Sequence, residues 1–173
     1  MKLEDIEADD LALKSKRAAS SLAARLANHQ SRHMVSALVR YAQRGDLPPD
    51  GLESVADLLL QAEDLMHHLN APGHRADVCD ALTLVFVAAA ARLAIDRDGT
   101  VGHEGLAALA GLSRKGLWQA SQRGDAPKPM ADGRHRVYDP DECRTWLTGR
   151  GVTGFAEVED DGKPWGDLDA CDP

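Results

Sequence analysis

Side chains with the chemistry to contact nucleic acid are concentrated between Ser113 and Arg136. A glutamine can form paired hydrogen bonds with adenine, so Gln119 and Gln122 are the best candidates for base readout. Lysine and arginine side chains, and the amides at the start of a helix, bind phosphate groups. The candidate DNA contacts are Ser113, Arg114, Lys115, Trp118, Gln119, Gln122, Arg123, Lys128, Arg134, His135 and Arg136.

Some of these residues also have a purely structural interpretation. Trp118 is equally suited to core packing, because aromatic residues often anchor small domains. Arg134, His135 and Arg136 would either contact the DNA backbone and the neighbouring minor groove or form a solvated hairpin.

Other chemistries find little support in the sequence. No nucleophile with a paired base is visible, and no glycine loop that would cradle a phosphate, so we expect neither an enzyme nor a cofactor. The segment around residues 96–105 resembles a calcium-binding loop, but it has Ala94 and Gly105 at positions where the loop needs ligands. Calcium binding is therefore not expected. Four further residues could in principle converge on a metal ion. They lack the closely paired spacing of metal sites, so a solvent-exposed helix face is favoured over a metal site. This set is Glu63, His67, His74 and Cys79.

Composition points to a soluble, mostly helical protein. Hydrophobic residues make up 43% of the 173 residues, but aromatic residues only 4%, and the alanine and leucine content favours helices. The three cysteines are far apart, which indicates neither a disulfide framework nor a zinc site. The acidic N-terminus is unlike a signal peptide, and the apolar run from Ala81 to Ala91 is shorter than the ~20 residues of a membrane span. We therefore expect a cytoplasmic location.

The net charge of -8 comes from the two ends of the chain. Residues 1–13 and 154–173 are strongly acidic, whereas residues 14–45 carry basic side chains and no acid. The middle of the chain is almost neutral, so the overall charge does not exclude nucleic acid as a partner.

The tetrapeptide Gln-Arg-Gly-Asp occurs twice, at residues 43–46 and 122–125. An exposed Arg-Gly-Asp can act as an adhesion ligand, but a glycine with a proline soon after it is also a common helix end. Because we expect an intracellular protein, the helix-end interpretation is favoured for both copies.

Hydrophobic spacing predicts an N-terminal helical module over residues 14–99. One or two helices should lie between Lys14 and Arg44, the next should run from a cap at Asp50 to about His68, and the last from about Arg75 to Ile95. The third helix is apolar nearly all round, which predicts burial either in a bundle or in a dimer interface.

Residues 100–150 predict a second, smaller unit. A short helix stops at Gly111, and Ser113 then caps a second helix that ends near Arg123. Residues 128–138 are expected to form two short strands about an Asp-Gly turn. Asp139 caps a last helix with Pro140 at its first position, anchored in the core by Trp146 and Leu147. The order of elements predicts a winged helix-turn-helix.

This second unit resembles the winged helix-turn-helix domains of excisionases and MerR-like regulators over residues 100–148. The resemblance implies that the segment after Arg123 leaves a recognition helix and feeds the wing. It is carried by the ordered set Leu106, Ala107, Gly111, Leu112, Ser113, Arg114, Leu117, Trp118, Arg123, Gly124, Asp125, Pro127, Pro129, Gly133, Arg136, Val137, Tyr138, Glu142, Trp146 and Leu147.

The expected protein is thus mostly α, with an acidic segment (1–13), a helical module (14–99), a winged helix-turn-helix domain (100–150) and an acidic flexible tail (151–173). We expect the residues from about Gly154 onward to be flexible or loosely docked. The predicted function is sequence-specific binding of double-stranded DNA, as a bacterial or mobile-element regulator that dimerises through its N-terminal helices. The alternative is an adaptor of DNA-packaging or inhibitor type, whose winged domain and acidic ends bind a protein.

Overall fold

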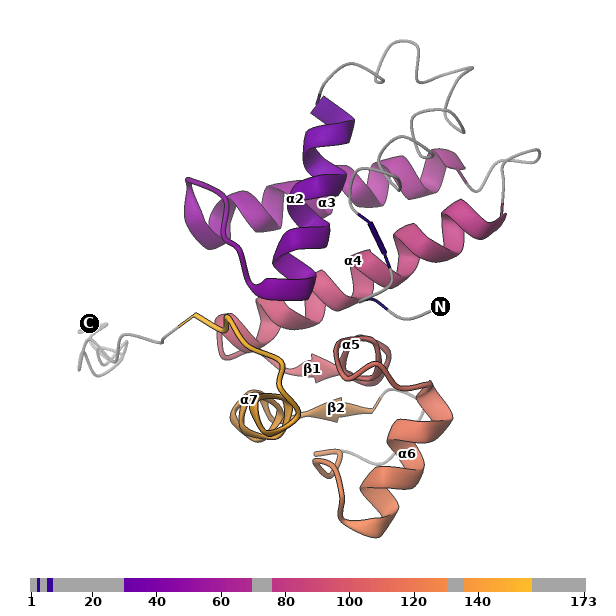
Figure 1. The fold of residues 1–173 in the computed structure, drawn as a ribbon, viewed down its shortest axis with the longest axis vertical. Helices are drawn as coiled ribbons and strands as arrows, with labels where there is room; N and C mark the ends of the chain where they lie inside the picture. Colours follow the sequence, from indigo (N-terminus) through magenta and orange to yellow (C-terminus); the bar gives the residue numbers. More distant parts are fainter. Residues whose placement is uncertain (1–2, 4–5, 8–29, 70–75, 131–135, 157–173) are drawn as a thin grey trace, which may run out of the picture.

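The computed structural model describes residues 3, 6–7, 30–69, 76–130 and 136–156 (Figure 1). This part of the chain is mostly helical, as the composition predicted. Its helices are α2 (Gln30–Arg44), α3 (Gly51–Leu69), α4 (Ala76–Asp96), α5 (His103–Leu109), α6 (Arg114–Arg123) and α7 (Pro140–Gly149). Two short strands, β1 (Val101–Gly102) and β2 (Val137–Tyr138), pair antiparallel. The helix expected over residues 14–29 lies outside the described residues.

Helix α4 lies in the middle of the molecule, between α2 and α3 on one side and α5, α7 and the sheet on the other (Figure 1). Its residues Val85, Ala88 and Ile95 are buried. The surrounding helices and the sheet therefore cover most of the apolar surface of α4. Of the two explanations that the sequence left open, burial within a bundle therefore applies to most of α4. One strip that includes Phe86 and Ala90 is only half buried.

The hydrophobic core continues across residues 99 and 100, where the sequence suggested a boundary. Only four residues separate the end of α4 from β1. Near the other end of the chain, Leu3 and Ile6 are also buried. Their carbonyl groups accept hydrogen bonds from Nε2 of Gln43, at 2.8 and 2.9 Å.

Both Gln-Arg-Gly-Asp segments end helices, as predicted. Helix α2 stops at Arg44 and α6 at Arg123. The next residues, Gly45 and Gly124, have φ angles of +77° and +81°. This left-handed conformation suits glycine and closes the last helical turn with backbone hydrogen bonds, from Gly45 N to Tyr41 O and from Gly124 N to Ser121 O.

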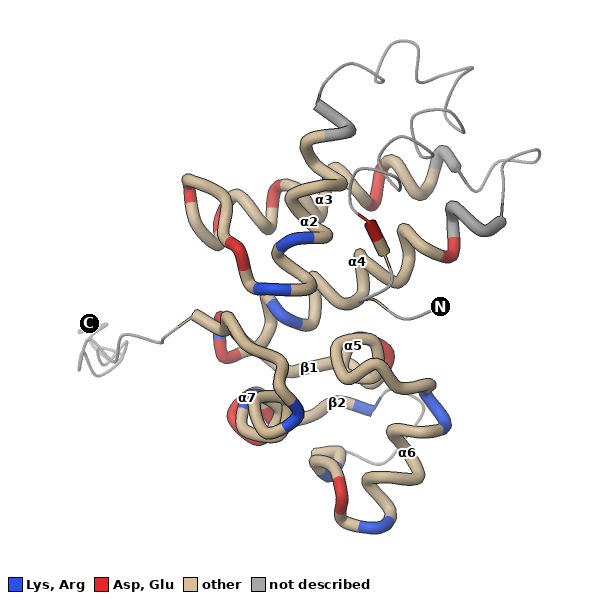
Figure 2. Tube along the Cα trace, viewed as in Figure 1, with Lys and Arg blue, Asp and Glu red and all other residues tan. Residues whose placement is uncertain are grey.

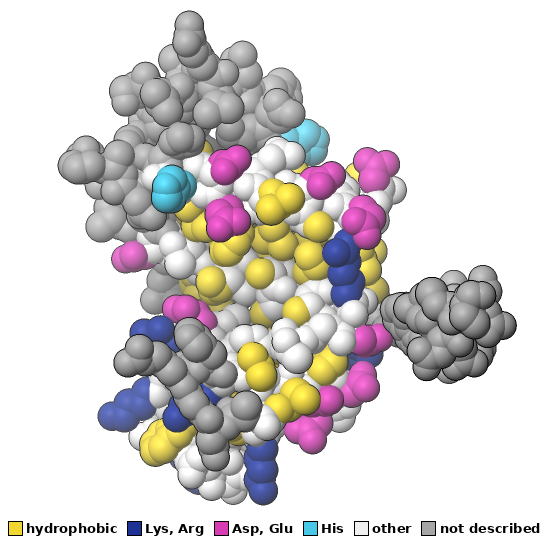
Figure 3. All heavy atoms as spheres, turned by 180° about the vertical axis from the view of Figure 1, so that it is seen from behind, with side chains coloured by type: hydrophobic (Ala, Val, Ile, Leu, Met, Phe, Trp, Pro, Cys, Tyr) yellow, Lys and Arg dark blue, Asp and Glu magenta, His cyan; other side chains and the backbone are white. Residues whose placement is uncertain are grey.

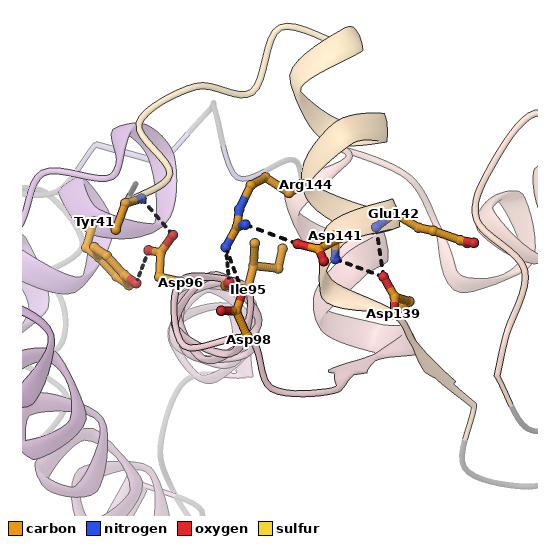
Figure 4. A network of polar contacts seen from close by, with 9 residues as sticks. Tyr41, Ile95, Asp96, Asp98, Asp139, Asp141, Glu142 and Arg144 are labelled. Carbon is orange, nitrogen blue, oxygen red and sulfur yellow. Dashed lines mark hydrogen bonds and ion pairs between the residues drawn. The ribbon is translucent and has the colours of Figure 1, made fainter. Parts of the chain in front are cut away.

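A polar network at the end of α4 holds three distant segments together (Figure 4). The Tyr41 hydroxyl donates to Oδ2 of Asp96 at 2.6 Å, and the amide of Ala156 donates to Oδ1 at 2.9 Å. From α7, Nη2 of Arg144 donates to the Ile95 carbonyl at 2.6 Å. A cation there satisfies the free carbonyl groups at a helix C-terminus. Burial next to Asp96 raises the pKa of Tyr41, so its hydroxyl stays a donor.

The segment after α7 packs onto α4 through Arg92. This side chain is fully buried. Its Nη1 donates to the Thr153 carbonyl at 3.0 Å, and its guanidinium lies 4.5 Å from the centre of the Phe155 ring. Burial lowers the pKa of Arg92. Phe155 and Ala156, the first residues of the tail that was expected to be flexible or loosely docked, are thus half buried and contact α4.

The predicted hairpin differs from the observed sheet. Strand β2 pairs with β1, with Val101 opposite Tyr138, instead of with residues 128–130. That segment meets β2 through one backbone hydrogen bond, from Met130 N to Val137 O at 2.8 Å. Prolines at 127 and 129 have no amide proton to donate to a ladder, which explains why no strand forms there. The predicted turn falls within residues 131–135, outside the described residues.

Helix α7 begins as predicted, because Oδ1 of Asp139 accepts from the amides of Asp141 and Glu142 at 3.0 Å. Leu147 is fully buried. Trp146 is only half buried, which corrects its expected place in the core, and its Nε1 donates to the Asp125 carbonyl at 2.7 Å. Across the described residues, no helix has the length and apolar character needed to cross a membrane.

Candidate nucleic-acid interface

Helices α5 and α6 are joined by a tight turn of four residues, Ala110–Ser113. The turn is held by a hydrogen bond from Leu112 N to Ala107 O at 2.9 Å. Ser113 caps α6 as predicted, since its Oγ accepts from the amide of Gly116 at 3.0 Å. Two short helices are thus fixed relative to each other by local bonds that the sequence signalled.

Helix α6 has one buried and one exposed side. Leu117, Ala120 and Ser121 face the core, and Oγ of Ser121 donates to the Pro127 carbonyl. This bond ties the segment after the helix to its buried face. The seven candidate contacts between residues 113 and 123 all lie on the exposed side of α6 or at its start: Ser113, Arg114, Lys115, Trp118, Gln119, Gln122 and Arg123.

Trp118 is 40% exposed, so the core-packing interpretation does not hold for it. Its ring lies 5.9 Å from the guanidinium carbon of Arg136, which precedes β2. A cation over an indole face is attracted by the ring's negative surface. The contact brings Arg136, near the end of residues 128–138, to the exposed side of α6, although Arg136 and Trp118 are 18 positions apart.

The remaining predicted contacts are less completely placed. Lys128 is exposed on the segment that follows α6. Arg134 and His135 lie outside the described residues. Two of the arginines are partly neutralised by exposed acids: Arg123 Nε lies 2.8 Å from Asp125, and Arg114 lies 3.6 Å from Glu104.

Charge is segregated in this half of the molecule (Figure 2). From Arg114 to Tyr138 the described residues include five basic side chains and one acid, Asp125. The acids of α7, Asp139, Asp141 and Glu142, lie apart from them. Seen from behind, hydrophobic side chains cross the middle of the surface, with Lys and Arg concentrated on one side of the lower part (Figure 3). A local basic surface exists despite the net charge of -8.

His103 joins three segments of the candidate interface, a role that was not predicted from the sequence. Its Nε2 lies 2.9 Å from the Arg114 carbonyl and its Nδ1 lies 2.7 Å from the Tyr138 hydroxyl. A carbonyl can only accept, so Nε2 donates, and in the neutral ring Nδ1 accepts from the tyrosine. The partners are 11 and 35 residues away, which is why local pattern could not reveal them. His103 is a positioning residue for α6 and β2.

Replacing His103 with alanine should lower the free energy of unfolding by about 1–3 kcal/mol, because the Tyr138 hydroxyl then loses its partner inside the core. Denaturant unfolding measures this change. His33→Ala, at an exposed position of α2, is the matched control and should leave the unfolding free energy nearly unchanged. Equal effects of the two substitutions would remove His103 from the positioning role.

The buried groups beside the interface stay neutral near pH 7. Burial raises the pKa of Tyr138, and burial together with the neighbouring carboxylates of Asp139 and Glu142 raises the pKa of the Cys143 thiol to about 12. Neither Tyr138 nor Cys143 therefore changes its charge near pH 7 beside the exposed side of α6.

The possible metal ligands are only partly described. Glu63 and His67 lie exposed on α3, whereas the side chains of His74 and Cys79 fall outside the described residues. Among the side chains that the structure describes, no three of His, Cys, Asp or Glu come together as a metal site would require.

Comparison of the chain with protein-family models, with curated proteins and with solved structures gave no match.

Proposed function

We propose that this chain is a sequence-specific DNA-binding protein, acting as a transcriptional regulator of bacterial or mobile-element origin. In this proposal α5 and α6 form the helix-turn-helix, and residues 128–138 form the wing. The observation that carries it is the exposed side of α6, where Lys115, Gln119 and Gln122 project from a helix fixed by its capped start and its buried leucine. Such a helix can enter the major groove.

Each part of the surface has a distinct role in this proposal. Lys115 and Arg136 neutralise phosphates, whereas Gln119 and Gln122 form hydrogen bonds with base edges. Trp118 offers an apolar surface to a sugar or a thymine methyl group, and Arg136 fixes its ring. Arg134 and His135 extend the contact along the backbone from the wing.

A homodimer formed through the N-terminal helices completes the proposal. One small domain offers limited contact area, and binders of this kind commonly occupy two half-sites. Most of α4 is used inside the chain, so α3 is the better candidate for pairing: its Leu60 side chain is 64% exposed. Sedimentation of the DNA complex should give a protein mass of twice 18.6 kDa.

The alternative function is that of an adaptor which binds a protein. The exposed acids of α3, Glu53, Asp57, Glu63 and Asp64, favour it, because they offer a basic partner a complementary surface. A gel shift on duplex DNA of random sequence separates the two functions. A DNA-binding regulator shifts the duplex in a salt-sensitive way, whereas an adaptor leaves it unshifted at every salt concentration.

Replacing Gln119 with alanine should relax the base preference at one position of the binding site. We expect a loss of about 1–3 kcal/mol for the preferred sequence and little change for unrelated DNA, because the amide reads a base edge and carries no charge. Selection of bound duplexes from a random pool, followed by affinity measurement, tests this. Thr145→Ala, at an exposed position of α7 outside the proposed DNA and dimer surfaces, is the control. An unaltered preferred sequence would show that Gln119 is not a reader.

A further inference from the structure

A groove of about 720 Å³ lies between α4 and the start of α5. Its floor is the half-buried strip of α4 formed by Phe86, Val87, Ala90 and Ala94. Its other wall carries Arg114 and Arg136, together with one acid, Glu104, which lies 3.6 Å from Arg114 and is exposed. An apolar floor beside two cations suits a segment that combines a large apolar side chain with carboxylates.

The chain itself contains such a segment. Residues 157–173 carry seven acids and one lysine, together with Trp165. They follow directly after Ala156, whose amide is hydrogen bonded to Asp96. Asp96 lies in the last turn of α4, two residues beyond Ala94 and therefore about 200° away around the helix axis. The segment thus starts at the end of α4 where the groove also ends, and it must pass around that end of the helix to reach the strip. Trp165 lies nine positions after Ala156, enough to span up to ~30 Å, whereas Ala94 and Phe86 are ~12 Å apart along the helix.

We propose that residues 157–173, hereafter the acidic tail, dock into this groove with Trp165 on the α4 strip and carboxylates beside Arg114 and Arg136. The N-terminal segment fits less well. Its acidic part, residues 1–13, contains no aromatic residue, and residues 14–29 are basic and would meet like charge. A docked tail occupies two of the candidate DNA contacts, Arg114 and Arg136, and so competes with DNA. This competition rests on the proposed function, whereas the docking itself does not.

Docking is tested without DNA. A chain ending at Ala156 keeps the contacts of Phe155 and Ala156, and a fluorescein-labelled peptide of residues 157–173 is added to it. Fluorescence anisotropy should show binding that weakens roughly fivefold or more between 50 and 200 mM NaCl. A peptide with Trp165→Ala should bind at least ~10-fold more weakly, as expected for loss of an aromatic anchor.

The groove is tested by Ala90→Glu in the shortened chain, which places a carboxylate on the floor and should weaken the peptide at least ~10-fold. Gln61→Glu adds the same charge on α3, away from the groove, and should leave binding unchanged. Absence of binding, or binding that neither Trp165→Ala nor Ala90→Glu weakens, would overturn the docking. So would a dimer of the shortened chain that Ala90→Glu dissociates, because a second copy would then fill the groove.

Competition is tested on duplex DNA with the full-length and shortened chains. At 50 mM NaCl the shortened chain should bind roughly fivefold more tightly, and the difference should fade toward 200 mM. Equal affinities with a bound peptide would overturn the competition and leave the docking. If neither chain binds DNA while the peptide still docks, the proposed function fails and the docking stands.

Discussion

Replacing Gly105 with alanine is expected to lower the free energy of unfolding by about 2 kcal/mol, within the range for overpacked cores. Gly105 lies at the closest approach of α4 and α5. A Cβ atom there would lie 2.5 Å from the Cβ of Ala91 and 2.6 Å from the Val87 carbonyl oxygen. Both neighbours belong to the helix in the middle of the core, so neither can move without shifting α4. The clash outweighs the ~1 kcal/mol that alanine gains over glycine in a helix.

Gly149→Ala is the matched control for this prediction. Gly149 is also helical, it is exposed, and a Cβ there meets nothing within 4 Å. Alanine should therefore raise the free energy of unfolding by a few tenths up to ~1 kcal/mol. Urea unfolding of both variants gives the comparison. A shift of the same sign at the two positions would contradict the close contact between α4 and α5.

The parts of the fold that the sequence predicted correctly depend on neighbours within a few residues. Ser113 and Asp139 cap their helices because the amides they bind lie two or three positions away. Gly45 and Gly124 end helices because only the local backbone must turn. The exposed side of α6 followed from helical periodicity in the same way.

The parts that the sequence did not predict depend on contacts between distant segments. Strand β2 pairs with β1, and His103 bonds Tyr138, across more than 30 residues. The pattern of residues 128–138 indicated a hairpin because an Asp-Gly turn is a local signal, whereas the competing partner at Val101 carries none. Phe155 is docked because a buried arginine on α4 receives it, which composition could not show.

Replacing both Lys115 and Arg136 with alanine is expected to weaken DNA binding at 0.1 M salt by roughly 60-fold, for all sequences alike. Each phosphate contact contributes ~0.9 to the slope of log affinity against log salt, so two lost contacts lower the slope by about 1.8. The contribution of counterion release to the affinity vanishes near 1 M salt. Going from 1 M to 0.1 M is one decade, so a slope lower by about 1.8 reduces the affinity at 0.1 M by about 10 to the power 1.8, or roughly 60-fold. Affinities measured from 0.05 to 0.3 M salt give the slope directly.

The control removes the same charge from another surface. Arg40 is exposed on α2, and Arg97 is exposed directly after the end of α4. Arg97 forms an exposed ion pair with Glu53 at 2.7 Å, whose loss costs little stability. Their double replacement lowers the net charge of -8 by two, as the first pair does. If both pairs lower the slope equally, long-range charge explains the effect and α6 is not the DNA-contacting surface. A lower slope for Lys115 and Arg136 alone requires that phosphates lie against α6 and the segment before β2, because screening limits the influence of exposed charges to ~10 Å at 0.1 M salt.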